Sequence, residues 1–525
     1  MDAWSQLSNR LLEKYHIKIP IEKRFFLTFV DDDDDTNIQK QKIIDHLISQ
    51  GFLEDDPRVE QLYHNFKLLV KTDSMNYDEF KYCVENHICI LKKIFRYECI
   101  IPRFSPFCNQ IRSLYDDSFS CQSGKNADYI PQLSRINPDQ YGISICTIDG
   151  QRHNIGDTSV EFSVQSCCKP INYAIALENL GEEHVHTYVG REPSGQSFNE
   201  LLLNKMGKPH NPLINSGAIM TTSLLYPDKD LAERFESIIN VWTKLCGGLH
   251  KVGFNNPVYL SEKKTADRNY ALAHFMNEIN ENKPIGFPPQ TNLNETLELY
   301  FQCCSIEVTT EILSIIAATL ANGGINPFTG DKVFTPKTVQ NVLSMMLTCG
   351  MYDYSGEFAF KIGIPAKSGV AGAIMIVIPN VMGIATWSPR LDDIGNSKRG
   401  IEFCKLFGSM FNFHIFDNLS DTTKINPIVD TYTTESIHQF SELCMAAQQG
   451  DLEYLKFLFN KEIDLNQNDY DGRTALHVAV CENNESIVKF LIQIGKVNQM
   501  KKDRWNHTPK DEAETHHPHL LQYFQ

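Results

Sequence analysis

The chain has 525 residues, which is enough for roughly three or four domains with buried cores. Its 65 acidic and 49 basic residues leave a formal charge of −16, which argues against nucleic acid or an anionic membrane surface as a partner. Fifteen cysteines, without a series of Cys-x-x-Cys motifs, indicate reduced thiols in an intracellular protein. The most apolar stretches, 312–321 and 373–387, are too short to cross a bilayer, so no membrane span is expected.

Residues 1–100 predict a small helical module. Its clearest signal is an apolar stripe at helical spacing, formed by Val59, Leu62, Tyr63, Phe66, Leu69 and Val70. The acidic run at 31–35 resembles the start of an EF-hand calcium loop. A loop beginning at Asp31 would place Thr36 where glycine is needed and Lys42 where the bidentate glutamate belongs. We therefore expect a solvated acidic loop there.

Residues 116–417 predict one larger α+β domain. Alternating apolar residues at 141–148 precede an Asp-Gly turn, and the segments 373–378 and 382–387 flank a Pro-Asn turn. Because each hairpin joins neighbouring segments, the pattern favours an antiparallel sheet over a doubly wound parallel one. Helical patterns occupy the sequence between the two hairpins.

A Ser-x-x-Lys tetrapeptide at 166–169 marks a candidate catalytic site, although 261–264 and 486–489 share its pattern. A strand is expected over 160–165 and a helix from the tetrapeptide to Gly181, so Ser166 is predicted at a helix N-terminus. Backbone N–H groups there would stabilise an oxyanion. Lys169 would lie one turn on, and burial would lower its pKa so that the neutral amine could accept the serine proton.

A Lys-Ser-Gly segment at 367–369 begins another strand, and its pairing with Ser-x-x-Lys is typical of serine acyl-transfer enzymes. No metal site is predicted, since no Cys/His cluster has zinc-finger spacing. His184 and His186 lack H-E-x-x-H spacing and are expected in a strand or loop.

Residues 436–525 repeat themselves with a period of 33 residues, and the second unit opens with Thr-Ala-Leu-His at 474–477. This period and tetrapeptide predict ankyrin repeats, with a third, partial unit from about His507. Because so few repeats bury only a small core of their own, we expect them to pack on another surface or to be marginally stable. They would also offer a surface to a protein partner.

Several motifs together resemble the kidney- and liver-type glutaminases of animals. The matching segments are 162–170, 210–218, 267–269, 304–308, 349–353 and 367–372. That family also carries an EF-hand-like N-terminal region and C-terminal ankyrin repeats, so the resemblance covers almost the whole chain. It implies a catalytic domain with the fold of serine β-lactamases and penicillin-binding proteins, which agrees with the α+β prediction.

The resemblance implies hydrolysis of L-glutamine to L-glutamate and ammonia through a glutamyl-ester intermediate. Ser166 would attack the side-chain amide carbon with Lys169 as its base. Backbone N–H groups of Ser166 and Val370 would hold the oxyanion, and Tyr352 would relay a proton. From its residue type alone, Tyr352 would instead be a buried core tyrosine.

Selecting free glutamine requires groups that bind both its α-ammonium and its α-carboxylate. Glu262 is the natural partner for the ammonium. The resemblance adds Tyr129, Gln165, Asn215, Asn269 and Tyr300 to the substrate-binding set, beside Ser166, Tyr352 and Val370. Asn215 or Asn269 could instead cap a helix, and Glu262 could be a surface carboxylate.

Kidney-type relatives are phosphate-activated tetramers in which a loop near the active site lies at the subunit interface. The matching loop spans 195–204, where Leu202 replaces an aromatic residue and Glu200 a basic one, which leaves phosphate activation open. No other cofactor is expected. A homotetramer is expected because Phe198, Leu201, Leu202 and Leu203 would otherwise form an exposed apolar patch.

The first forty residues contain acidic runs and no signal-peptide core. The sequence therefore predicts a cytoplasmic protein, or one that has lost its presequence, whereas the resemblance implies mitochondria. Two other functions stay open. A hydrolase of β-lactams or peptides would share the serine and lysine without needing Glu262. A scaffold without catalytic activity would use only its ankyrin repeats, but the chain keeps the serine, both motif lysines and Tyr352.

Overall fold

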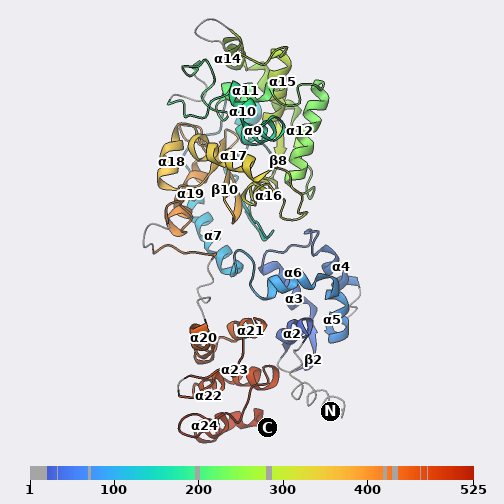
Figure 1. The fold of residues 1–525 in the computed structure, drawn as a ribbon, viewed down its shortest axis with the longest axis vertical. Coiled ribbons are helices and arrows are strands. Elements are labelled where there is room, and N and C mark those ends of the chain that lie inside the picture. Colours follow the sequence, from blue (N-terminus) through green and yellow to red (C-terminus); the bar gives the residue numbers. More distant parts are fainter. Residues whose placement is uncertain are drawn as a thin grey trace. The chain divides into compact units, whose positions relative to one another are not determined.

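In the computed structural model, the described residues are 20–31, 34–68, 73–195, 201–278, 286–417, 423–428, 436–461, 463–469 and 471–524. The chain divides into two compact units (Figure 1). One comprises Met1–Gln50, Arg58–Arg103 and Val429–Gln525, and the other comprises Gly51–Pro57 and Phe104–Ile428. Within the described ranges, no helix combines the length and apolar character that crossing a membrane requires.

The N-terminal part of the first unit mixes helices with short strands. Its elements are α2 (Ile21–Thr28), β1 (Val30–Asp31), β2 (Asp34–Gln39), α3 (Lys40–Ser49), α4 (Glu60–Leu68), β3 (Ser74–Asn76), α5 (Tyr77–Val84), η1 (Glu85–His87) and α6 (Ile88–Phe95). The strands form an antiparallel sheet in the order β1-β2-β3. The predicted helices are present, and the short strands among them were not anticipated from the sequence.

Of the acidic loop predicted at 31–35, Asp31 instead ends β1 and Asp34 begins β2, whereas residues 32 and 33 lie outside the described ones. Ile38 on β2 lies opposite Met75 on β3, and both side chains are buried. Ile38 also lies opposite Val30 on β1, so this one apolar residue makes apolar pairs with both neighbouring strands. One buried residue among charged neighbours gives too weak an alternation to detect in the sequence.

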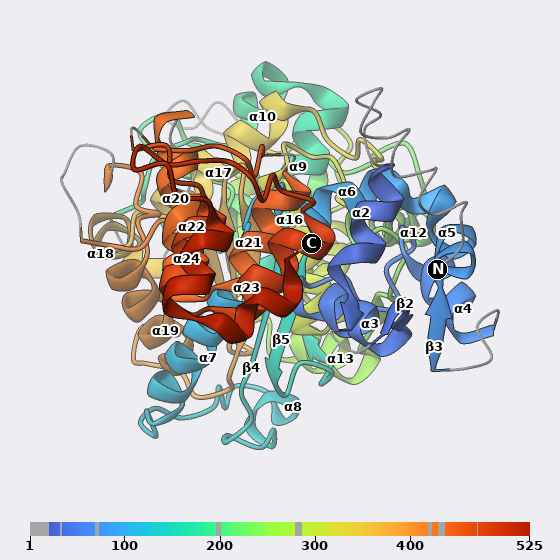
Figure 2. The same ribbon diagram turned by 90° about the horizontal axis from the view of Figure 1, so that it is seen from below.

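The C-terminal part of the first unit is a series of helix pairs, shown side by side in orange to red in Figure 2, and the predicted ankyrin repeats are confirmed. The elements are α20 (Ser436–Gln449), α21 (Leu452–Asn460), α22 (Ala475–Cys481), α23 (Glu485–Lys489), the π-helical turn η5 (Phe490–Ile494), α24 (Pro509–His516) and η6 (Pro518–Tyr523). In the Thr-Ala-Leu-His segment, the backbone N–H of Thr474 donates to His477 Nδ1 at 3.0 Å, which caps α22.

Within this unit the repeats contact the N-terminal helices. The Arg24 guanidinium donates to the Phe459 carbonyl at 3.0 Å, and the rings of Tyr97 and Phe457 meet edge to face at 5.2 Å. These contacts agree with the expectation that a short repeat array needs a second surface on which to pack.

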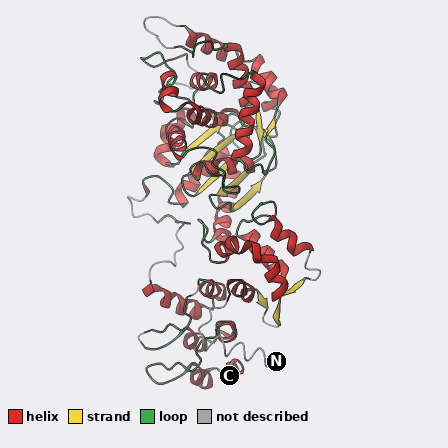
Figure 3. Cartoon of the chain, turned by 45° about the vertical axis from the view of Figure 1, so that its right-hand side comes forward, coloured by secondary structure: helices red, strands yellow, loops and turns green. Residues whose placement is uncertain are grey.

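The second unit is built on a five-stranded antiparallel sheet in the order β5-β4-β11-β10-β9 (Figure 3). Its strands are β4 (Gly142–Thr147), β5 (Arg152–Gly156), β9 (Ala366–Gly369), β10 (Ala373–Ile378) and β11 (Met382–Trp387). Both predicted hairpins are present, and their turns contain Gly150 and Asn380 with φ angles of 77° and 62°. The predicted antiparallel α+β class is confirmed.

Helices cover both faces of this sheet. On one face, α16 (Thr310–Ala321) packs so closely on β11 that a Cβ added to Gly383 would lie 2.2 Å from the Ala318 nitrogen. On the other face, α19 (Lys398–Met410) packs with α7 (Phe104–Phe119), and a Cβ at Gly400 would lie 2.8 Å from Ile374 Cδ1. Alternation along the strands assigns these contacts to opposite faces, which leaves both sides of the sheet buried.

A helical region carries the candidate site residues. Its elements are α8 (Pro131–Ser134), η2 (Gln165–Cys167), α9 (Cys168–Leu180), α10 (Glu182–Tyr188), α11 (Asn215–Ser223), α12 (Leu231–Leu245), α13 (Asn256–Lys264), α14 (Asp267–Asn277), α15 (Leu293–Cys304), α17 (Pro336–Cys349), η3 (Tyr352–Tyr354) and α18 (Ser355–Lys361). A small antiparallel sheet is formed by three short strands in the order β6 (Phe162–Ser163), β8 (Ile306–Val308) and β7 (Gly253–Phe254). Each strand adjoins one or two of these helices in the sequence. β6 leads into η2 and α9, β7 leads into α13, and β8 follows α15.

Candidate active site

Ser166 lies in the 3₁₀ turn η2, directly before α9, and its side chain is half-buried. The predicted strand before it is shorter than expected and covers only Phe162–Ser163. Gln165 has a φ angle of 47°, which is unusual for a residue with a side chain. Holding it there costs on the order of 1–3 kcal/mol, a strain of the kind that concentrates at functional sites.

Lys169 lies in the first turn of α9 and is 1% exposed. Its amine donates to Asn215 Oδ1 at 2.6 Å. Burial lowers the pKa of Lys169 to about 8, although neighbouring cysteine thiols partly oppose the shift. A neutral amine at this position can accept a proton near neutral pH.

Tyr352 begins η3 with a φ angle of 52°, so a second site residue has the left-handed backbone conformation. Burial raises the pKa of the Tyr352 hydroxyl, and the nearby Ser166 hydroxyl partly opposes this shift. The Lys367 amine lies 4.7 Å from the centre of the Tyr352 ring and donates to the Ser368 carbonyl at 2.6 Å. Burial, reinforced by the positive charge of Lys169, lowers the pKa of Lys367 to about 7.

Val370 follows the end of β9, and Gly369 allows that strand to approach the Ser166 turn. A Cβ at Gly369 would lie 2.8 Å from the Val164 carbonyl oxygen and 3.3 Å from Cys167 Sγ. The Cys167 thiol in turn lies 3.4 Å from the Lys367 carbonyl. The two segments that carry Ser166 and Val370 are therefore in direct contact, and any larger residue at 369 would separate them.

Three predicted substrate-binding residues form one network. The Tyr129 hydroxyl donates to Glu262 Oε1 at 2.6 Å, and the Gln165 amide donates to the same oxygen at 3.0 Å. Burial raises the pKa of Glu262, whereas these two hydrogen bonds lower it. Glu262 is 9% exposed, so the alternative of a surface carboxylate is wrong.

The other predicted residues surround Asn215, the first residue of α11. Its Oδ1 accepts from Lys169 and from the Tyr300 hydroxyl at 3.4 Å, and its Nδ2 donates to Asn269 Oδ1 at 3.3 Å. No side-chain cap is made at the start of α11 or α14. The amides of Asn215 and Asn269 therefore bond each other and, through Asn215, side chains from two further helices, instead of capping their own helices.

The two other Ser-x-x-Lys segments lack this setting. Ser261 is in the last turns of α13, with Lys264 exposed, and Ser486 is exposed on α23. The Lys-Ser-Gly motif marks Lys367 in the sequence but does not assign it a role. Its contact with the Tyr352 ring depends on the fold and cannot be predicted from the sequence.

His184 and His186 lie on α10, so their predicted placement in a strand or loop was wrong. His186 bonds the Tyr173 hydroxyl at 2.9 Å and the Val189 carbonyl at 3.0 Å, which explains its place in the packing. Of the predicted interface loop, Phe198 and Glu200 lie outside the described residues. Leu201 and Leu202 are described and are 43% and 41% exposed.

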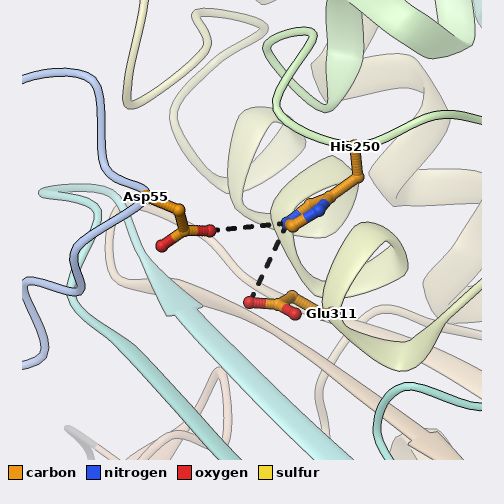
Figure 4. Close-up of side chains that lie close together, drawn as sticks. All are labelled: Asp55, His250 and Glu311. Atoms are coloured by element: carbon orange, nitrogen blue, oxygen red, sulfur yellow. Dashed lines mark ion pairs between the residues drawn. The ribbon is translucent and has the colours of Figure 1, made fainter. Parts of the chain in front are cut away.

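Asp55, His250 and Glu311 bring three possible metal ligands together in the second unit (Figure 4). Both carboxylates lie 3.9 Å from His250 Nε2. The buried Arg152 guanidinium already donates to Asp55 Oδ2 at 2.9 Å and to Glu311 Oε1 at 3.2 Å. Arg152 therefore supplies the positive charge that these carboxylates require.

A second such group, Asp503, His507 and Glu512, lies in the ankyrin region. Asp503 Oδ1 accepts the backbone N–H groups of Trp505 and His507, both at 2.9 Å. These bonds form a turn between repeats, so the carboxylate has a structural use.

Comparison with known proteins identifies the family. A family model described as Glutaminase matches residues 124–416. The chain belongs to the glutaminase family. Further models described as Ankyrin repeats (3 copies) and EF-hand domain match residues 426–509 and 21–102. The family assignment makes the chain a hydrolase that acts on glutamine, which decides against the β-lactam, peptide and scaffold alternatives.

Similar proteins support this assignment. A glutaminase liver isoform, mitochondrial, from Rattus norvegicus is 44% identical over 472 residues, covering 89% of this chain and 77% of the relative. A putative glutaminase 2 from Caenorhabditis elegans is 42% identical over 499 residues, covering 92% and 82%. A solved structure of Mglu in its glutamate form is 34% identical with a TM-score of 0.55, covering 60% of this chain and 71% of that one.

Proposed function

We propose that the chain hydrolyses L-glutamine by a Ser166–Lys169 dyad through a glutamyl-ester intermediate. The observation that carries this proposal is the burial of Lys169, which favours the neutral form of its amine. Its buried amine has a pKa of about 8 and lies one turn from Ser166. Roughly a tenth of such an amine is neutral at pH 7, which is enough to supply a base for the serine hydroxyl.

In the first half-reaction, Ser166 Oγ bonds to the side-chain amide carbon while Lys169 takes the hydroxyl proton. The tetrahedral intermediate then collapses, the C–N bond breaks, and ammonia leaves with a proton delivered through Tyr352. In the second half-reaction, water loses a proton to the dyad and attacks the ester, which releases glutamate and restores the serine. Backbone N–H groups of Ser166 and Val370 would hold the oxyanion in both steps.

Selectivity for free glutamine is assigned to the residues around Glu262 and Asn215. A buried carboxylate whose only described contacts are neutral hydrogen-bond donors would be stabilised by the substrate's α-ammonium. The amides of Asn215 and Asn269 and the hydroxyl of Tyr300 would bind the remaining polar groups of the substrate. A β-lactam or a peptide would leave Glu262 buried and unpaired.

Several broader properties are proposals as well. A homotetramer would cover the exposed Leu201 and Leu202, and inorganic phosphate could act as an activator through assembly. The ankyrin repeats would bind a protein partner. A mitochondrial location is supported by the names of the mammalian relatives. Fractionation of the native source tests the location.

The dyad is tested with Ser166→Ala and with Ser486→Ala, a serine of the same pattern exposed on α23. Ammonia release from glutamine should fall at least about a thousandfold for Ser166→Ala, because no other group can form the ester. Ser486→Ala should keep the wild-type rate. Circular dichroism checks that both variants are folded. Equal rates for Ser166→Ala and the wild type would exclude the mechanism.

A further inference from the structure

Two buried thiols face each other beside the candidate site. Cys168 is the first residue of α9 and Cys304 is the last residue of α15, and their Sγ atoms lie 3.9 Å apart. Both side chains are buried, with exposures of 0% and 5%. The contact joins the start of the helix that carries Lys169 to the end of the helix that carries Tyr300.

This position connects the thiol pair to the substrate network. Cys168 precedes Lys169, and Cys304 follows Tyr300 by one helical turn. Lys169 and Tyr300 both bond the same oxygen, Asn215 Oδ1. The Cys304 thiol also interacts electrostatically with Lys169 and with Glu262. A covalent change at the pair would therefore move two residues that hold Asn215.

The other thiols near the site have different surroundings. Cys167 Sγ lies 3.4 Å from the Lys367 carbonyl and 3.9 Å from the Ala373 carbonyl. Cys303 hydrogen-bonds Asn172. All fifteen cysteines of the chain are free thiols. The geometry thus singles out Cys168 and Cys304 as a pair that can react with each other.

We propose that Cys168 and Cys304 form a reversible oxidation site, at which a peroxide converts the two thiols into a disulfide that inhibits the enzyme. A disulfide needs the sulfurs about 2.05 Å apart. The separation must therefore shorten from 3.9 Å by roughly 2 Å. Rotation about the Cα–Cβ bonds and movement of the ends of α9 and α15 must together supply this shortening.

The chemistry balances with hydrogen peroxide as the oxidant. Cys304, the more exposed of the two, loses its proton to the neutral Lys169 amine and attacks one peroxide oxygen. The O–O bond breaks, giving a sulfenic acid and hydroxide, which takes the proton back from lysine as water. Cys168 then attacks the Cys304 sulfur, the S–S bond forms, and the sulfenic oxygen leaves with the Cys168 proton as a second water.

The protonation of Cys304 limits the rate of this reaction. The hydrogen bond with Cys168, together with burial, raises the pKa of the Cys304 thiol well above its ordinary value, so the thiol is protonated and slow to react without a base. The same Lys169 amine that is proposed to activate Ser166 provides that base. Oxidation would then displace Lys169 and Tyr300 from Asn215. The inhibition rests on the proposed role of Lys169 in catalysis, whereas formation of the disulfide requires only that the Lys169 amine accept the thiol proton.

The test treats the purified full chain with hydrogen peroxide and follows two independent readouts. Peptide mapping by mass spectrometry under non-reducing conditions should find a Cys168–Cys304 cross-link with the loss of two hydrogen atoms. Glutaminase activity should fall at least about fivefold and return on addition of dithiothreitol, as expected for a disulfide but not for higher sulfur oxides.

The variants Cys168→Ala and Cys304→Ala should resist peroxide, each compared with its own untreated activity. Cys404→Ala removes a buried thiol on α19 and should respond like the wild type. The proposal is overturned if peptide mapping finds no Cys168–Cys304 cross-link, if the cross-link leaves activity unchanged, or if Cys168→Ala is inhibited as strongly as the wild type. Peptide mapping does not depend on catalysis, so a failure of the disulfide proposal can be distinguished from a failure of the dyad mechanism.

Discussion

Two buried lysines define the chemistry at the scale of single residues. Lys169 and Lys367 both lie in the interior, and burial lowers their pKa values to about 8 and about 7. Among the described residues neither amine is paired with a carboxylate, since one donates to an amide oxygen and the other to a backbone carbonyl. Because neither acceptor carries a negative charge that would offset burial, the protonated form of each lysine is disfavoured. Each lysine can therefore lose its proton near neutral pH.

The pH dependence of the enzyme should follow Lys169. The protonated amine cannot act as a base, so kcat/KM should rise as pH increases through about 8. Between pH 7 and pH 8.5 the neutral fraction, and with it kcat/KM, should grow roughly eightfold. Steady-state kinetics of ammonia release measure this profile. A flat profile from mildly acidic to alkaline pH would contradict the role.

Lys169→Arg provides the matched variant, because arginine keeps a positive charge but stays protonated at every accessible pH. It should lose activity across the whole range and show no alkaline rise. If Lys169→Arg instead kept the wild-type profile, the titrating group would have to be another residue, of which Lys367 is the nearest candidate.

At the scale of elements, the site depends on close contact between β9 and the turn that carries Ser166. Gly369 permits this contact, since a Cβ there would lie 2.8 Å from the Val164 carbonyl oxygen. Backbone atoms cannot move aside as a side chain can. Gly369→Ala should therefore shift the β9 end away from Ser166 and lower kcat on the order of a hundredfold, with a smaller change in KM.

Gly356→Ala on α18 is the matched control, because a Cβ there meets nothing within 4 Å. In a helix this change should leave kcat unaltered and raise stability slightly, by up to about 1 kcal/mol. Thermal unfolding and steady-state kinetics of both variants distinguish a local displacement from general destabilisation. A Gly369→Ala enzyme with wild-type kcat would show that the close approach is unnecessary.

The sequence predicted the local parts of this arrangement well. The helix from the Ser-x-x-Lys motif to Gly181 and both hairpins follow from periodicity and turn residues. Contacts between distant segments had no such signal. Lys169 and Asn215 are 46 residues apart, and Tyr129 and Glu262 are 133 apart. Only the motif resemblance proposed them as one set, and the pairing of β1 with β2 was missed because Ile38 alone gives β2 an apolar signal.

At the scale of the whole molecule, the chain is acidic and divides into two units. One unit carries the candidate active site, and the other contains the ankyrin repeats. The ankyrin helices form their own apolar core, to which Tyr97 of the N-terminal module is added. The catalytic unit has a separate core between its sheet and its helices. Each unit can therefore retain its packing while the other binds a partner or changes its assembly.

Assembly gives the prediction for the complete chain. Leu201, Leu202 and Met206 are 43%, 41% and 60% exposed within six residues of one another. Exposed apolar side chains this close in sequence are typical of surfaces that another subunit covers. We expect the protein to form tetramers, and the double variant Leu201→Asp/Leu202→Asp to dissociate toward smaller species, because buried unpaired carboxylates would oppose the contact.

Light scattering measured alongside activity tests this prediction. The conservative variant Leu202→Met keeps the apolar surface and should remain assembled. Dissociation of the aspartate variant should lower activity as well, because the segment 195–204, to which Leu201 and Leu202 belong, is expected to link assembly to catalysis. A wild-type chain that is monomeric and fully active would refute both the tetramer and the link between assembly and catalysis.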